Sequence, residues 1–75
     1  MAESNEAPKP IHPATAQVLK YFAYEHLPEP LQEISKPFCD LAYAMVLQLP
    51  ESPEVTVGVR KLLEAKDCFV RARLP

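Results

Sequence analysis

The chain has one glycine, two cysteines, two histidines and no tryptophan among its 75 residues. A single glycine excludes the glycine-rich loops with which many enzymes cradle phosphate groups. The histidines, His12 and His26, stand at no spacing from the cysteines that is typical of a metal site. No serine or cysteine stands with a histidine in a motif typical of nucleophilic catalysis. We therefore expect no catalytic residues, no metal and no cofactor, and a protein that is not an enzyme.

Long apolar runs are also absent. The sequence therefore predicts neither a signal peptide nor a membrane span. We expect a cytoplasmic protein, because a reducing compartment suits two cysteines that form no disulfide framework.

Two long stretches with helical periodicity are present, and a short proline-bearing connector, LPESP, joins them. Apolar residues recur at steps of three and four, which gives one apolar stripe on each helix. They are Leu27, Leu31, Ile34, Phe38, Leu41, Met45 and Leu49 before the connector, and Val55, Val59, Leu62, Ala65, Phe69 and Ala72 after it. A short connector folds two such helices into an antiparallel hairpin. The sequence thus predicts an all-α fold, with a short N-terminal helix followed by a long antiparallel two-helix hairpin.

Prolines set most of the expected boundaries. We expect a flexible acidic arm over 1–11 and a single helical-hairpin domain over 12–75. The short helix should span about 13–25, the second helix 28–49 and the third 53–73, with Ser52 as the N-cap of the third. Pro37 predicts a kink in the second helix, where Ser35 could bond a freed carbonyl. Two interpretations stay open there: a curved helix that wraps its partner, or a polar notch beside Lys36.

The cysteines should not pair with each other. In a hairpin that turns near Glu51, Cys39 and Cys68 are offset by about 9 Å along the helix axes, which is too far for a disulfide. We expect both to be small core residues.

A second apolar face should lie beside the first stripe of the hairpin. It comprises Val57, Leu63, Val70 and Leu74, together with Ala42, Ala44 and Val46. A lone hairpin would leave this face in water, so we expect the chain to assemble into a compact homo-oligomer.

Positive charge gathers near the C-terminus although the net charge is −2. Residues 56–75 carry five basic and two acidic side chains. One interpretation is a solvated helix face with cations near a helix C-terminus, where the helix dipole favours them. The other is a small anion-binding site.

Aromatic and cationic side chains of the type that binds nucleotides occur together. The aromatic and imidazole rings are Tyr21, Tyr24 and His26, and the cations are Lys36, Arg60, Lys66, Arg71 and Arg73. Rings can stack on bases, and cations can pair with phosphates. The alternative is that Tyr21 and Tyr24 only cover the end of the hairpin.

Several segments of the chain together resemble one known family. They are YFAYEHLP at 21–28, Leu31, Ser35, Phe38, Leu41, Ala42, Leu49, Pro50 and Glu54, RKLLEAKD at 60–67, and VRA at 70–72. In these residues the chain resembles the phage helical-hairpin family of cyclic-oligonucleotide sponges, the anti-CBASS proteins that sequester bacterial immune second messengers. The resemblance covers about 12–73.

The resemblance implies a compact homohexamer of three-helix protomers in the cytoplasm of the host cell. It implies binding without cleavage of cyclic dinucleotides such as 3′,3′-cGAMP between protomers, with cyclic trinucleotides as possible ligands of a second pocket. It assigns Tyr24, or else Tyr21, to stacking a base, Lys36 to the dinucleotide site and Arg71 to the trinucleotide site. With His26 and Arg60 these are the candidate ligand-binding residues, and we expect no binding to long nucleic acid or to membranes.

Two other functions compete with this expectation. One is a structural helical oligomer or adaptor that binds another protein through its apolar face. The other is a DNA mimic or regulator of a host enzyme, which the uneven charge supports only weakly.

Overall fold

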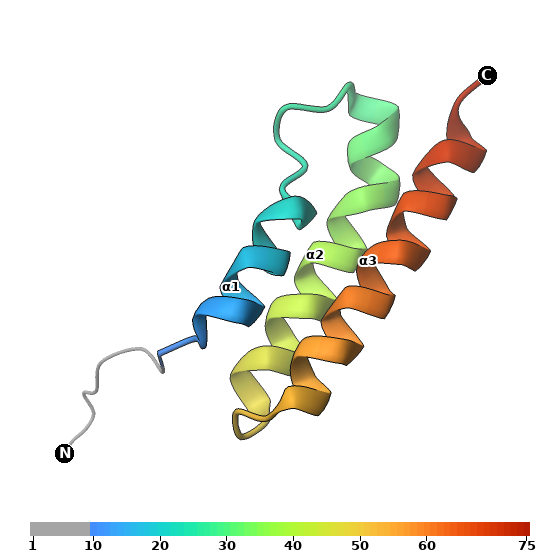
Figure 1. The fold of residues 1–75 in the computed structure, drawn as a ribbon. Coiled ribbons are helices and arrows are strands. Elements are labelled where there is room, and N and C mark those ends of the chain that lie inside the picture. Colours follow the sequence, from blue (N-terminus) through green and yellow to red (C-terminus); the bar gives the residue numbers. More distant parts are fainter. Residues whose placement is uncertain (1–9) are drawn as a thin grey trace, which may run out of the picture.

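The computed structural model describes residues 10–75, and every regular element in that range is helical (Figure 1). The elements are α1 (Pro13–Leu19), the 3-10 helix η1 (Lys20–Phe22), α2 (Glu29–Gln48) and α3 (Pro53–Arg73). The predicted all-α fold is confirmed. The expected flexible arm falls almost entirely on residues 1–9, outside the described range; Ile11, at its end, packs against the core.

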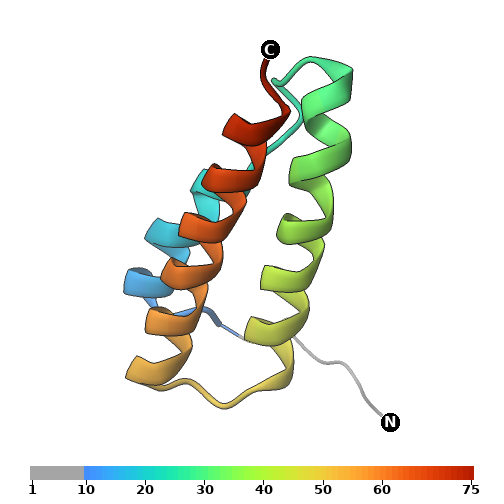
Figure 2. The same cartoon turned by 90° about the vertical axis from the view of Figure 1, so that its right-hand side faces the viewer.

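Helices α2 and α3 form the expected antiparallel hairpin (Figures 1 and 2). Prolines mark where each of these helices begins. Pro28 is the N-cap of α2 and Pro30 lies in its first turn, where a missing N–H costs no helical hydrogen bond. Ser52 is the N-cap of α3 and Pro53 its first residue, as predicted. The Ser52 side chain, however, makes no capping hydrogen bond.

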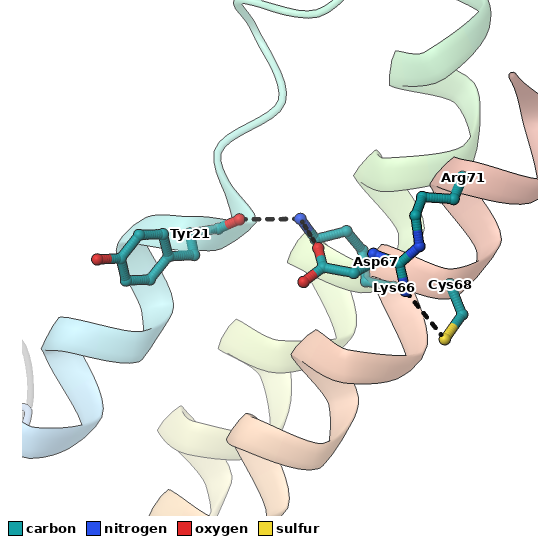
Figure 3. Close-up of polar contacts among 5 residues, drawn as sticks. All are labelled: Tyr21, Lys66, Asp67, Cys68 and Arg71. Carbon is teal, nitrogen blue, oxygen red and sulfur yellow. Dashed lines mark hydrogen bonds and ion pairs between the residues drawn. The ribbon is translucent and has the colours of Figure 1, made fainter.

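The first helix is shorter than predicted. It leaves α-helical geometry after Leu19, continues as η1 to Phe22, and turns extended at Ala23, where ψ is 138°. Lys66 of α3 donates a hydrogen bond of 3.0 Å from Nζ to the Tyr21 carbonyl oxygen (Figure 3). This long-range contact satisfies a carbonyl near the end of the helix, which the helix itself leaves open. The expected continuation to residue 25 is therefore wrong.

Lys66 is consequently part of the fold and does not belong to the exposed cations. Its side chain is buried where α3 packs against η1, and the whole residue is only 9% exposed. Its Nζ also pairs with Asp67 at 2.9 Å and lies 6.0 Å from the centre of the Phe22 ring. A buried ammonium requires such partners, because burying it alone would cost several kcal/mol.

Helix α1 packs against the hairpin and completes its core. The hydroxyls of Thr15 and Thr56 share a hydrogen bond of 2.7 Å that joins α1 to α3. Phe22, at the end of η1, is 0% exposed. The buried apolar core consists of Val18, Leu19, Phe22, Ala42, Val46 and Val59.

The buried face of α2 differs from the predicted stripe by one residue. Leu41, Met45 and Leu49 were expected in the seam but are 46%, 38% and 44% exposed. Ala42 and Val46, expected on the second face, are buried in the core. One residue along a helix corresponds to a rotation of about 100°. A shift of one residue between the predicted and the observed pattern therefore means that a different side of α2 is buried. The physical reason is α1, which covers the side of the hairpin that carries the smaller residues.

The second apolar face is accordingly not the one predicted. Leu63 packs against the core, whereas Val57 and Leu74 are exposed. Exposed apolar side chains also line a groove between α2 and α3, described below.

Helix α2 runs through Pro37 without interruption. Ser35, two residues earlier, is 0% exposed. Within residues 10–75 its Oγ has no hydrogen-bond partner, so the expected bond to a freed carbonyl does not form. A buried hydroxyl without a partner loses its hydration without compensation.

We predict that Ser35→Ala stabilises the protein. The change removes the unsatisfied hydroxyl and introduces a better helix former, for an expected gain of about 1 kcal/mol. Urea unfolding followed by circular dichroism measures it. The matched control is Ser52→Ala, at a partly exposed N-cap whose side chain makes no cap bond, which should change stability by a few tenths of a kcal/mol. A loss of stability in Ser35→Ala would show that the hydroxyl is satisfied.

Candidate ligand-binding site

The segment between η1 and α2 carries Tyr24 and is tied to α2 by one glutamine. Gln32 Nε2 donates to the Leu27 carbonyl oxygen at 2.8 Å and to the Glu25 carbonyl oxygen at 3.3 Å. A turn closes within the segment, because the Leu27 N–H donates to the Tyr24 carbonyl oxygen at 3.0 Å. These contacts fix the backbone at Tyr24 beside the first half of α2.

Lys36 of α2 reaches the ring of Tyr24. Its Nζ lies 6.0 Å from the centre of that ring, at the limit of a cation–π contact. The same Nζ donates to Asp40 Oδ2 at 2.9 Å, one helical turn further along. The hydrogen bond and charge of Asp40 raise the pKa of Lys36 above its ordinary value, so the ammonium stays charged throughout the physiological range. The structure thus brings together two of the residues that the sequence singled out.

Asp40 is the member of this group that sequence reasoning missed. Its spacing of four residues from Lys36 is the signal that could have found it. An anion bound by Lys36 must displace or share the Asp40 carboxylate. Both side chains are more than half exposed, and ion pairs at such surfaces contribute only about 0–1 kcal/mol, so the exchange costs little.

The remaining candidates lie apart from this pair. Tyr21 is exposed, with Lys20 Nζ 5.6 Å from its ring centre, and its ring points away from Lys66 (Figure 3). His26 is exposed in the turn before α2. Arg71 is exposed and donates from Nη2 to Cys68 Sγ at 3.5 Å. Arg60 is exposed on α3.

A stacked aromatic pair shows which positions of α2 and α3 lie side by side along the hairpin axis. The ring centres of Phe38 and Phe69 are 5.7 Å apart. Lys36 and Arg71 each lie two residues beyond this pair, toward the same end of the hairpin. Arg60 lies nine residues before Phe69, or about 13 Å away along the helix axis. Lys36 and Arg71 thus share one end of the molecule, and Arg60 does not.

The same aromatic pair corrects the expected offset between the cysteines. Cys39 and Cys68 are each sequence neighbours of a stacked ring, so they lie at similar heights and not 9 Å apart. Both are free. Cys39 is half-buried against the core, while Cys68 is exposed, which makes the expectation of two core cysteines wrong for Cys68.

We predict that Cys68 reacts with iodoacetamide well before Cys39. Burial, followed by the nearby Asp40 and Glu25 carboxylates, raises the pKa of the Cys39 thiol above its ordinary value, while Lys36 opposes the shift. Since the thiolate is the reactive form, Cys39 needs a higher pH than an ordinary thiol. Mass spectrometry of the single variants Cys39→Ser and Cys68→Ser measures each rate across pH 7–10. Equal rates at pH 7.5 would contradict the burial of Cys39.

Two grooves of about 580 Å³ and 540 Å³ lie near the α2–α3 connector, and neither is lined by Tyr24 or Lys36. A ligand between Tyr24 and Lys36 would therefore have one face open to solvent or to another chain. Among residues 10–75 no group of histidine, cysteine and acidic side chains could hold a metal ion, and no helix there is long and apolar enough to cross a membrane.

Comparison with models of protein families gave no match, and neither curated proteins nor solved structures showed significant similarity to the chain.

Proposed function

We propose that this protein is a sponge: it binds cyclic oligonucleotide second messengers, foremost cyclic dinucleotides such as 3′,3′-cGAMP, and sequesters them without cleavage. In a phage-infected cell this would block CBASS-type antiviral signalling. The observation that carries the proposal is the contact between Tyr24 and Lys36, a ring able to stack on a base beside an exposed cation able to pair with a phosphate. The sequence resemblance to the sponge family supports the same ligand class.

Self-assembly is part of the proposal. We propose a homohexamer whose ligand sites lie between protomers, with Tyr24 and Lys36 on one wall of each dinucleotide site. The open side of the Tyr24–Lys36 pair supports this arrangement, because a second chain could supply the missing wall. The exposed apolar side chains of α2 and α3 support assembly in general.

Sequestration is chemically undemanding, which suits a chain of this composition. A sponge lowers the free ligand concentration through its affinity and number of sites, and it needs no catalytic group. A cyclic dinucleotide carries two negative charges, which Lys36 and one further cation can match. The net charge of −2 disfavours attraction to long nucleic acids.

Thermal-shift screening against cyclic di- and trinucleotides tests the ligand class. A ligand that binds only the folded protein raises the unfolding temperature with its concentration. We expect a shift with 3′,3′-cGAMP and none with linear dinucleotides or AMP at equal concentration. The absence of a shift with every cyclic nucleotide at millimolar concentration would contradict the proposal.

A structural oligomer or protein adaptor is the second candidate function. The observation that favours it is the apolar groove between α2 and α3, where Leu41 and Met45 are exposed. This function requires the same helices and the same assembly but no small-molecule ligand. The thermal-shift panel therefore separates the two.

A further inference from the structure

The groove between α2 and α3 is open along the half of the hairpin nearest the connector. It has a volume of about 580 Å³ and is almost wholly apolar. Its walls carry Leu41 and Met45 from α2, Leu49 directly after α2, and Val55, Gly58 and Leu62 from α3. No residue of α1 contributes to the lining, and Figure 2 shows α1 behind the two long helices.

Gly58, within this groove, has no role that the protomer itself explains. A methyl group added at its Cα would meet nothing within 4 Å. Glycine is less favourable than alanine inside a helix, so a protomer in isolation would be better served by alanine. Glycine at an open groove allows the backbone of another helix to approach closely.

Charged residues along the same side of α3 indicate which helix would approach Gly58. Glu54 lines the groove four residues before Gly58, and Lys61 follows three residues after it. Seven residues separate Glu54 from Lys61, which places both on one side of the helix. Both are exposed, and neither has an ion pair within residues 10–75.

A two-fold axis at Gly58 would bring these opposite charges together between two copies of the chain. Glu54 lies about 6 Å from the level of Gly58 in one direction, and Lys61 about 4.5 Å in the other. When a second copy crosses antiparallel at this point, each Glu54 comes to the level of the partner copy's lysine at position 61. Such an interface is isologous, so the same Glu54–Lys61 ion pair forms twice, once on each side of the axis.

We propose that a second copy of this chain docks antiparallel in the groove, with α3 crossing α3 at Gly58, to form a four-helix unit. The inference rests on the self-assembly part of the proposed function and not on its ligand. The docking buries the exposed apolar side chains of both grooves, which a single chain leaves in water. It also sets Glu54 against Lys61 across the interface.

Gly58→Leu tests the docking without touching the protomer core. We expect the variant to keep its helical content by circular dichroism, because a Cβ atom at this position meets nothing within 4 Å and leucine is a better helix former than glycine. We expect the dissociation constant of the dimeric unit, measured by sedimentation velocity, to rise at least tenfold. The matched control is Ala16→Leu, the same kind of enlargement at an exposed position on α1, which should leave the dissociation constant unchanged.

Charge reversal identifies the occupant of the groove. Glu54→Lys and Lys61→Glu should each weaken association several-fold, and the double variant should restore it, because both partners are then reversed together. Failure of the double variant to restore association would show that the groove does not receive a second copy in this register. Nucleotide binding plays no part in this readout.

The outcomes separate this inference from the proposed function. A wild-type oligomer that Gly58→Leu leaves intact would overturn docking in the groove while leaving assembly through another face. A wild-type mass of 8.4 kDa at micromolar concentration would overturn both the docking and the proposed assembly. Loss of association in Gly58→Leu with rescue in the charge-reversed double variant supports the inference.

Discussion

Replacing Phe22 with alanine is expected to unfold a large fraction of the protein at 25 °C. Phe22 is the largest fully buried side chain among the described residues, and it lies where η1 meets α2 and α3. Truncating such a side chain typically costs about 3–5 kcal/mol, because the apolar contacts are lost and a cavity remains. A core of this size supplies only about 3–5 kcal/mol in total, so the variant should retain little or no stability margin.

Phe69→Ala is the matched control for Phe22→Ala. It makes the same chemical change at a ring that is 56% exposed and stacks on Phe38. We expect a loss of about 1 kcal/mol there, mostly from the aromatic pair. Urea unfolding by circular dichroism, at one protomer concentration for all variants, measures both effects. Similar losses in the two variants would contradict the placement of the core under α1.

The second large effect concerns ligand binding. Tyr24→Ala should weaken binding of 3′,3′-cGAMP by about 1–3 kcal/mol, or roughly 5- to 150-fold, the usual contribution of a base stacked on an aromatic ring. Lys36→Ala should weaken it as well and should make the remaining affinity less dependent on salt, because one ionic contact is gone. Calorimetric titration of the folded variants at two salt concentrations measures both.

Four further variants test the assignment of the site. Tyr43→Ala is the matched control, because Tyr43 is an exposed tyrosine of α2 outside the Tyr24–Lys36 contact, and its loss should leave affinity unchanged. Asp40→Asn should strengthen binding a few-fold, because it removes the carboxylate that pairs with Lys36. Arg71→Ala should weaken mainly cyclic trinucleotide binding. Unchanged dinucleotide affinity in both Tyr24→Ala and Tyr21→Ala would contradict the assignment of the stacking ring.

The helices and their order could be predicted because local signals specify them. Pro28, Pro30 and Pro53 mark where α2 and α3 begin, and apolar steps of three and four carry the pattern across each helix. The two long helices were accordingly predicted to within one residue at each end.

The errors arise where a distant segment overrides a local pattern. The end of the first helix depends on Lys66, which lies 45 residues from the Tyr21 carbonyl that it binds. The buried side of α2 depends on where α1 docks, and the periodicity alone permits either of two adjacent faces. A sequence pattern indicates that a helix is amphipathic, but the neighbour that packs on it decides which residues are covered.

The candidate site could be predicted in part. The sequence indicates Tyr24 and Lys36 as residue types that bind nucleotides, and the structure adds the contact between them. The contact itself could not be predicted, because a turn and two prolines separate the two residues. The path of this segment depends on the Gln32 side chain, which binds it to α2. The sequence does not mark Asp40 as part of a site, because a lysine and an aspartate four residues apart form a common ion pair on helix surfaces.

Sequestration without cleavage can be tested by calorimetric titration of the wild-type protein with 3′,3′-cGAMP, followed by chromatography of the ligand recovered after denaturation. We expect saturable binding with sites in fixed proportion to protomers, and recovery of the cyclic dinucleotide intact. Absence of binding at millimolar ligand, or the appearance of linear products or mononucleotides, would contradict it.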